Sequence, residues 1–305
     1  MSLLAITGAT GFVGSAVLNE ALAQGHQVRA LARRAQSPRA GVEWVRGDLA
    51  DETALAALVE GADAVIHVAG LTNTPDPAEF ETANVTGTVN VLAAMKDAGV
   101  RRLVFVSSLA ARQPELSRYG ASKAKAEALV EASGLDWTTV RPPGVYGPRD
   151  VDYLEMFRTA KWGFVPLPPG GASSIIHADD LARLLVVLAS GNSAPTRKKV
   201  YEPDDGREGG WSHKELAAAI GRAMDRGKVF APHLPRAVLE AAAAADRIAR
   251  GDSAKLTADR VGYMCHPNWV ARFDRKPPPG LWQPKISGEE GLKATAEWYK
   301  REGWV

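Results

Sequence analysis

The sequence contains almost no cysteine and no long apolar run. Cys265 is the only cysteine among 305 residues, so the chain has no internal disulfide, as is typical of a reducing cytoplasm. No apolar run approaches the roughly 20 residues that a membrane-spanning helix needs. The first residues lack the basic segment of a secretory signal and lead directly into a glycine motif. We therefore expect a cytoplasmic protein with no membrane partner.

The sequence also lacks an excess of charge of either sign. Lys and Arg number 37 and Asp and Glu number 35, which gives a net charge of +2 spread along the chain. Nucleic acids and anionic membranes attract strongly basic proteins, so this balance predicts neither as a partner. Met264-Cys265-His266 has no further ligands at metal-binding spacing, and we expect no metal.

Short apolar runs alternate with helical patterns through the first half of the chain. The strands that we expect are 3–7, 27–31, 42–46, 64–68, 103–107 and 136–141, and the helices are 12–24, 51–60, 78–98 and 119–132. Strands that alternate with helices of about 10–15 residues imply a parallel sheet with right-handed crossovers. The predicted fold class is therefore α/β, a doubly wound parallel Rossmann sheet.

Prolines and glycines interrupt this pattern after Arg141. Helical patterns resume later, at 179–189, 213–226, 235–250, 253–263 and from Ser287, where Ser287 and Glu290 form a capping box. We expect a dinucleotide-binding domain at 1–148, with a return contribution from about 172–202. Residues 149–171 and 203–305 would form a small, mostly helical substrate-binding cap on the carboxyl edge of the sheet.

The first motif with chemical content is Thr7-Gly8-Ala9-Thr10-Gly11-Phe12-Val13-Gly14, between the first strand and the first helix. In such a motif Gly8 permits a tight turn, Gly11 lets the backbone approach a pyrophosphate, and Gly14 lets helix and strand pack closely. The N-terminus of the helix supplies free N–H groups and positive dipole charge for the phosphates. The motif predicts a dinucleotide site.

The second motif is Tyr119-Gly-Ala-Ser-Lys123, on a predicted helix. Residues four apart share one helix face, and an ammonium close to a phenol favours the phenolate, so the phenol can exchange a proton near neutral pH. Ser107 and Ser108 end the strand that precedes this helix, at the edge where ligands bind in open α/β sheets.

These residues together resemble the extended branch of the short-chain dehydrogenase/reductase superfamily, over roughly residues 3–190. Further segments that match this branch, in its order, are His67-Val-Ala-Gly70, Asn84-Val-Thr-Gly-Thr-Val-Asn-Val-Leu92, Val104-Phe-Val-Ser-Ser108, Arg141-Pro-Pro-Gly-Val-Tyr-Gly-Pro148 and Ile176-His-Ala-Asp-Asp-Leu-Ala182. The resemblance implies a nicotinamide cofactor, a small-molecule substrate, and a homodimer formed through the helices at 78–98 and 119–132.

The resemblance also implies roles for individual residues. Tyr119 would be the general acid or base for an alcohol or carbonyl oxygen, Ser108 would hydrogen-bond that oxygen, and Lys123 would hold the ribose hydroxyls and favour the phenolate. Ser107 is a weaker candidate for the role of Ser108. The cofactor contacts that the resemblance implies are Gly8, Thr10, Gly11, Phe12, Val13, Gly14, Arg33, Asp48, Leu49, Val68, Ala69, Gly70, Asn84, Ser107, Tyr119, Lys123, Pro142 and Val145.

The sequence departs from the family where an acidic residue would bind the adenosine ribose of NAD. That position falls near Ala32, and Arg33 and Arg34 follow it. Because an arginine suits the 2′-phosphate of NADP, we favour NADP(H) over NAD(H); in the alternative, both arginines are solvated surface charges. The Asp-Glu pair of the family's dehydratases is replaced by Leu109-Ala-Ala-Arg112.

Three functions are compatible with these observations. The first is an NADP(H)-dependent oxidoreductase that interconverts a secondary alcohol and a ketone. The second is a nucleotide-sugar epimerase with tightly bound NAD, and the third is a non-catalytic NAD(P)-binding sensor or assembly subunit. Ser108, Tyr119 and Lys123 count against the third, and the missing acid near Ala32 counts against the second.

Two histidines invite a catalytic interpretation that we do not favour. His67 is expected to be a buried residue at a strand end. His177 stands beside Asp179 and Asp180, which suggests a dyad, but the adjacent aspartate is also a natural N-cap for the next helix, and we favour the cap.

Overall fold

The computed structural model describes residues 1–190 and 196–305 and divides into two compact units. The first unit consists of Met1–Arg141 and Leu181–Tyr201, and the second consists of Pro142–Asp180 and Glu202–Val305. Residues 191–195, which belong to the return segment predicted at 172–202, lie outside the described residues.

In the described part of the first unit, seven strands form one sheet in the order β10-β6-β5-β4-β1-β2-β3. All neighbouring strands are parallel, and this confirms the doubly wound α/β fold. The strands are β1 (Leu3–Thr7), β2 (Gln27–Ala32), β3 (Val42–Arg46), β4 (Ala64–His67), β5 (Arg102–Val106), β6 (Asp136–Val140) and β10 (Lys199–Tyr201). The central strands β4 and β5 are buried along their whole length, as expected for a parallel sheet covered on both faces.

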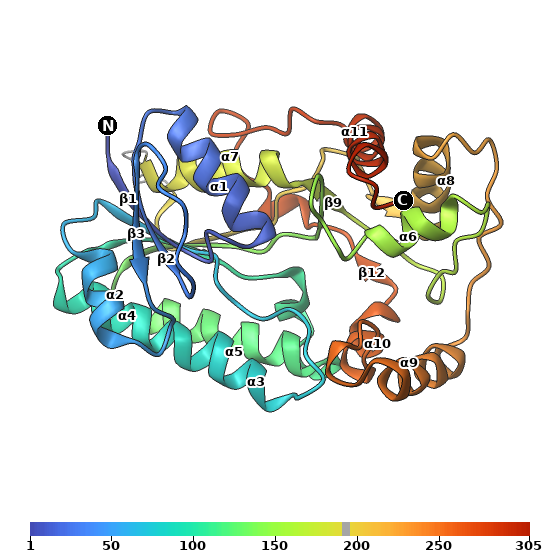
Figure 1. The fold of residues 1–305 in the computed structure, drawn as a ribbon, viewed down its shortest axis with the longest axis horizontal. Helices are drawn as coiled ribbons and strands as arrows, with labels where there is room; N and C mark the ends of the chain where they lie inside the picture. The colour runs from blue at the N-terminus through green and yellow to red at the C-terminus, as the bar shows by residue number, and fades with distance from the viewer. Residues whose placement is uncertain (191–195) are drawn as a thin grey trace. The chain divides into compact units, whose positions relative to one another are not determined.

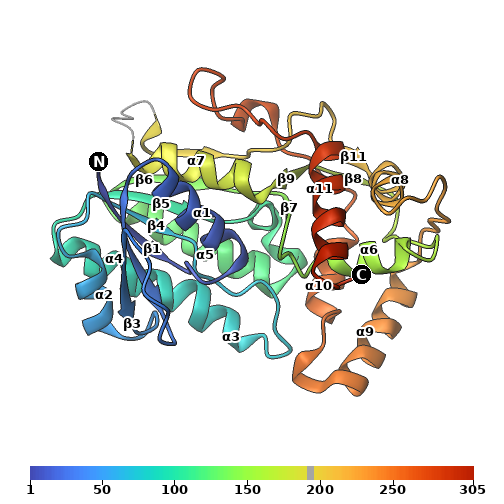
Figure 2. The ribbon, with the colours of Figure 1, turned by 45° about the horizontal axis from the view of Figure 1, so that its top comes forward.

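Helices cover both faces of this sheet. Figure 1 and Figure 2 show α1 and α7 on one face and α2, α4 and α5 on the other. The helices are α1 (Phe12–Ala23), α2 (Glu52–Val59), α3 (Ala78–Phe80), α4 (Gly87–Asp97), α5 (Arg118–Ala132) and α7 (Ala178–Ser190), with 3-10 turns at Leu109–Arg112 and Pro114–Leu116. A π-helical segment, Glu81–Thr86, joins α3 to α4 within the single helix predicted at 78–98. Leu55, Leu58 and Met95 pack with Leu103 and Phe105 of the sheet in the core of this unit.

Local hydrogen bonds explain where several helices begin. Asp51 caps α2 by accepting a hydrogen bond from Ala54 N, which confirms its predicted role. Ser117 accepts from Gly120 N and so starts α5 immediately before Tyr119. The capping box predicted at Ser287 is present.

The second unit contains helices and short strands. Its elements are β7 (Gly144–Tyr146), α6 (Leu154–Ala160), β8 (Ala172–Ser173), β9 (Ile175–His177), β11 (Trp211–Ser212), α8 (His213–Ala223), α9 (Arg236–Arg250), α10 (Ala258–Met264), β12 (Asn268–Trp269) and α11 (Gly288–Arg301), with 3-10 turns at Gly251–Ser253 and Phe273–Arg275. Aromatic residues such as Phe157 and Tyr299 pack in its core at a ring distance of 5.1 Å. The helix predicted at 253–263 begins only at Ala258, because Thr257 caps it there.

The boundary between the units differs from the prediction. Residues 142–148 and 172–180 were expected in the Rossmann domain, and both lie in the second unit. The reason is strand pairing: β7 pairs in parallel with β9, in a small sheet of its own, instead of extending the large sheet. No helix among the described residues is long and apolar enough to cross a membrane.

Candidate active site

The glycine loop joins β1 to α1 at the carboxyl end of the sheet. Gly8 has φ +73°, and a Cβ on it would lie 2.7 Å from Ala69 N, so only glycine fits between these two loops. A Cβ on Gly14 would collide with the carbonyl of Gly8, which shows how closely α1 approaches β1. A Cβ on Gly11 would lie 3.3 Å from Gly8 O, a tight contact that a small shift relieves. Gly14 therefore serves packing, whereas Gly11 keeps an exposed surface clear.

The N-terminus of α1 is suited to an anion. Gly11 is the N-cap, no side chain of the described residues caps the helix, and its first turn holds no acidic residue. The first N–H groups and the positive end of the helix dipole are thus left for a ligand. Thr10 and Gly11 are exposed at this end, and Phe12 and Val13 are half-buried. These residues fit the pyrophosphate of a dinucleotide.

A chain of hydrogen bonds starts beside the glycine loop and leads into the site. Ala69 N donates to Thr7 Oγ1 at 3.1 Å, so the Thr7 hydroxyl proton is free to bond His67 Nδ1, 2.6 Å away. On the other side of the ring, His67 Nε2 lies 3.2 Å from Thr88 Oγ1. Thr88 donates its own proton to Asn84 O at 2.7 Å and must accept from the imidazole. Nε2 therefore carries a proton, and in a neutral ring of this tautomer Nδ1 accepts the Thr7 proton.

The environment of His67 agrees with a neutral ring. The side chain is 1% exposed, and burial lowers its pKa to about 3, with the nearby Lys123 charge acting in the same direction. The expectation of a buried residue at a strand end is confirmed. What the sequence did not predict is that His67 links the loop after β1 to the helix that carries Asn84.

Asn84 connects this chain to the helix of the catalytic pair. Its Oδ1 accepts from Leu71 N at 2.7 Å, and its Nδ2 donates to Leu71 O and to Ser122 Oγ, both at 2.9 Å. Ser122 in turn donates to Tyr119 O at 2.8 Å. Asn84 lies in the π-helical segment, and π-helical turns are frequent at functional sites. A Cβ on exposed Gly70 would lie 2.9 Å from Asn84 Oδ1, so a larger residue would crowd this contact.

Lys123 is buried on the inner face of α5. Its Nζ donates to Val106 O at 2.8 Å and lies 4.6 Å from the centre of the Phe105 ring. Burial lowers the pKa of Lys123 to about 8, while the carboxylate of Glu127, one turn further on, acts to raise it. The ammonium form therefore still predominates at pH 7. Glu127 itself is held by the guanidinium of Arg141.

The two serines after β5 differ in their surroundings. Ser107 is buried, and its hydroxyl has no hydrogen-bond partner among the described residues. Ser108 is half-buried and accepts from Ala110 N at 3.2 Å, which leaves its proton available for an oxygen of a bound molecule. Tyr119 is buried, with its ring 5.9 Å from that of Phe80. Ser108 thus comes shortly after β5 and Lys123 binds the last residue of β5, so both lie at the carboxyl edge of the sheet, and Tyr119 lies one turn before Lys123 on α5.

The residues predicted on the adenosine side lie along the same edge. Arg33 directly follows β2 and is exposed, and Asp48 is exposed after β3, with Oδ1 accepting from Ala50 N. Leu49 packs closely against Gly87: a Cβ on Gly87 would lie 2.7 Å from Leu49 Cδ1. Val68 follows β4 and is half-buried. Pro142 and Val145 belong to the second unit, and their contact with a cofactor stays a prediction.

The prediction that an aspartate caps the helix after His177 is wrong. Asp179 N donates to His177 Nδ1 at 3.2 Å, so the histidine side chain is the acceptor, and Asp179 lies within the first turn of α7. Asp180 instead accepts from the backbone N–H groups of Lys285 and Ile286 at 2.9 Å. Burial lowers the pKa of His177, which favours the neutral ring that can accept.

Comparison with known proteins agrees with this geometry. A model of the family described as NAD(P)H-binding matches residues 8–190, more than half of the chain. The chain belongs to this family. Its motifs and its relatives place it in the extended short-chain dehydrogenase/reductase branch, so the first unit is an NAD(P)-binding domain.

Two curated relatives match over nearly the full length of the chain. A ceramide reductase of Caulobacter vibrioides is 32% identical and is covered over 96% of its length by 99% of this chain. A 2-alkyl-3-oxoalkanoate reductase of Stenotrophomonas maltophilia is 30% identical, with 94% of this chain and 96% of that protein covered. Among solved structures, MoeE5 in complex with UDP-glucose and NAD superimposes with a TM-score of 0.76, at 23% identity and 99% coverage of both chains. That last likeness concerns the fold alone.

Proposed function

We propose that the chain is an NADP(H)-dependent oxidoreductase that interconverts a ketone and a secondary alcohol. The observation that carries this proposal is the arrangement at the end of β5, where Ser108, Tyr119 and buried Lys123 lie on one edge of a dinucleotide-binding sheet. Two relatives that match nearly the whole chain are named as reductases, which supports the same reaction class.

The residues of this site suit the handling of a carbonyl oxygen and its proton. A reduced nicotinamide, when bound, supplies the hydride. The Tyr119 hydroxyl gives its proton to the carbonyl oxygen, and the Ser108 hydroxyl, already an acceptor from Ala110 N, donates a hydrogen bond to the same oxygen. The Lys123 ammonium stabilises the phenolate that remains, and its bond to Val106 O keeps it in place.

The relatives also suggest a substrate class. One is named for ceramide, a lipid with long alkyl chains, and the other for a 2-alkyl-3-oxoalkanoate, a 3-oxo acid that bears alkyl groups. We therefore propose that the ketone of this chain's substrate is carried on a long apolar chain. The cofactor would be NADP(H), because Arg33 follows β2 with an exposed guanidinium where the family places an acid for NAD.

The test is NADPH oxidation with 3-oxo esters whose alkyl chain is lengthened step by step. The proposal expects turnover, with kcat/KM increasing with chain length as more apolar surface is buried. Absence of turnover with every ketone would contradict the reaction, and a kcat/KM independent of length would contradict only the substrate class.

An epimerase is the second candidate, because a protein of Vibrio cholerae named UDP-glucose 4-epimerase is 27% identical over 72% of this chain and 75% of its own length. An epimerase returns its hydride to the same substrate and keeps NAD bound, whereas a reductase exchanges its cofactor in each cycle. The nucleotide that purifies with the protein therefore separates the two candidates.

A further inference from the structure

The turn after α6 places aromatic side chains at the surface of the second unit. Trp162 is 80% exposed, Phe230 69% and Phe164 40%. Gly163 has φ +77°, which lets the chain reverse between Trp162 and Phe164. Phe230 N donates to Gly163 O at 2.8 Å, Val165 N donates to Phe230 O at 2.9 Å, and the two phenylalanine rings lie 6.0 Å apart. These three residues, here called the aromatic patch, thus stand on two turns that hydrogen bonds hold together.

Positive charge surrounds this patch. Lys161 precedes Trp162, and Arg226 and Lys228 precede Phe230; all three are exposed, and we call them the basic rim. Arg226 Nε donates to Lys161 O at 2.9 Å, which brings the two turns together at the rim as well. Two carboxylates close to the rim in sequence bind other side chains: Asp225 pairs with Lys300, and Glu155 pairs with Arg158 and Lys255.

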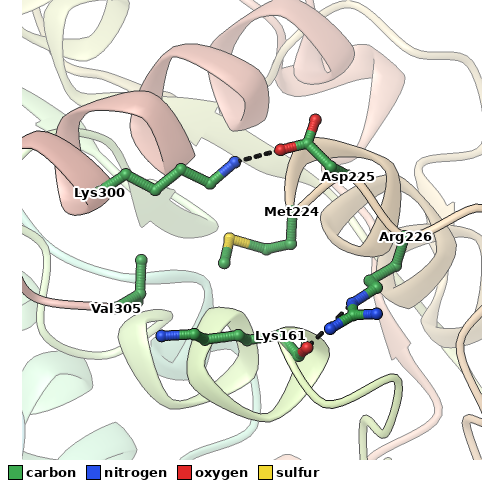
Figure 3. A pocket seen from close by; sticks show the side chains of 6 residues that line it. All are labelled: Lys161, Met224, Asp225, Arg226, Lys300 and Val305. Carbon is green, nitrogen blue, oxygen red and sulfur yellow. Dashed lines mark hydrogen bonds and ion pairs between the residues drawn. The ribbon is translucent and has the colours of Figure 1, made fainter.

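A hollow of about 390 Å³ opens beside the rim, between the ends of α6, α8 and α11. It is lined by Lys161, Met224, Asp225, Arg226, Lys300 and Val305. Figure 3 shows the Met224 side chain reaching into the space between Lys161 and Lys300. The carboxylate of Asp225 is bound by Lys300 at 2.6 Å, so it does not neutralise the rim.

We propose that this face of the second unit docks on a membrane surface that contains anionic lipids. Exposed Trp and Phe side chains partition into the boundary between headgroups and acyl chains, and neighbouring Lys and Arg side chains bind the anionic headgroups. The net charge of +2 predicts no such partner, because it describes the whole chain and not a local group of basic side chains.

A second copy of the chain fits this face less well. In a two-fold contact the same patch meets itself, so the basic rim of one copy would face the basic rim of the other. Juxtaposed like charges oppose such a contact, whereas an anionic lipid surface complements the rim.

The experiment is sedimentation of the full-length protein with phosphatidylcholine vesicles, with and without phosphatidylglycerol, in the absence of substrate and cofactor. We expect binding to the anionic vesicles only, and weaker binding as salt is raised. The double variant Trp162→Ala/Phe230→Ala should lose most of the binding. Lys161→Glu/Lys228→Glu should reduce it by more than tenfold, because each basic side chain contributes about fivefold.

Matched controls are Phe273→Ala and Lys214→Glu. Phe273 is 89% exposed on the same unit but outside the patch, and Lys214 is exposed on α8; both variants should bind like the wild type. Equal binding to neutral and anionic vesicles, or wild-type binding by both double variants, would overturn the proposal. So would dimers in analytical ultracentrifugation that Trp162→Ala abolishes, because the patch would then bind a second copy. Because no substrate is present, this result is independent of the reductase assay.

Discussion

At the scale of the residue, Lys123 shows how a site can work against stability. A buried ammonium has lost its water, and the lowered pKa of Lys123, about 8, measures that cost in part. The hydrogen bond to Val106 O and the ring of Phe105 compensate only in part. A residue kept at such a cost is expected at a functional site, which supports its assignment to the catalytic pair.

Lys123→Met should therefore separate stability from activity. The methionine fills the same space without a buried charge, so the melting temperature should not fall, while turnover with NADPH should drop by at least about 10². Differential scanning fluorimetry and steady-state rates are the measurements. Lys125→Met is the matched control, because Lys125 is exposed on the same helix and pairs with Glu81; it should keep its activity. A fully active Lys123→Met would refute the assignment.

Tyr119→Phe should remove turnover and preserve the site. The change deletes the proton that the carbonyl oxygen receives but leaves the ring against Phe80, so the rate should fall by about 10²–10⁴. NADPH affinity, measured by calorimetric titration, should change little. Tyr263→Phe, in the second unit, serves as a control for loss of a phenol and should be active. Retention of full activity by Tyr119→Phe would mean that another group supplies the proton.

At the scale of the element, the sequence predicts best what a continuous segment determines. The glycine loop, α1 and the cap at Asp51 follow from neighbouring residues, and all were predicted. The link from Thr7 through His67 to Thr88 was not, because it joins residues 60 and 21 positions apart and depends on the register of β1 and β4. The hydroxyl residues were visible within recognised motifs, but only the folded chain shows that they face one imidazole.

Two glycines of the same loop should respond differently to substitution. Gly11→Val should fold, because its Cβ needs only a small shift from Gly8 O, yet it should abolish NADPH binding by occupying the exposed end of α1. Gly14→Ala should lower the melting temperature, since its Cβ collides with backbone. Gly280→Val, where a Cβ would meet nothing within 4 Å, is the control for both. Unchanged NADPH affinity in Gly11→Val would show that the glycine loop does not bind the pyrophosphate.

The buried imidazole makes stability depend on pH. The folded-state pKa of His67 is lowered to about 3 from 6.5, so between these values the unfolded chain binds more protons. Its contribution to stability is complete above pH 6.5 and is lost as the pH falls towards 3. His177 and His213, whose pKa values burial also lowers, add to this slope. His67→Gln should therefore show a shallower fall of melting temperature between pH 7 and pH 4 than the wild type, and an equal slope would contradict the neutral buried ring.

At the scale of the whole molecule, the alternation of strands and helices predicts the large sheet. The division into units depends instead on the pairing of very short strands, which the sequence pattern hardly reveals. Strands of two or three residues, such as β7, β8 and β9, are too short to show a period of two, and β7 follows the last predicted strand so closely that it was assigned to the same domain. The observed return segment, Leu181–Tyr201, is accordingly shorter than the predicted one. The helix α6 was not predicted either, because its seven residues form barely two turns and are too few to show a helical period.

The nucleotide bound to the purified protein, and its preference for NADPH or NADH, distinguish a reductase from an epimerase. If Arg33 meets the 2′-phosphate, the charged contact should favour NADPH over NADH by about ten- to a hundredfold. Arg33→Asp should reverse this order, because the carboxylate repels the phosphate and accepts from the ribose hydroxyl, while Arg34→Asp should change it less.

The measurement combines titrations of both reduced cofactors with release of the bound nucleotide by denaturing freshly purified protein. A reductase exchanges its cofactor in every turnover, so gel filtration should leave the protein largely free of it. Stoichiometric NAD in the released fraction, together with equal affinity for the two reduced cofactors, would favour the epimerase. In that case the exposed guanidinium of Arg33 would be a solvated surface charge, and the substrate would be sought among sugar nucleotides.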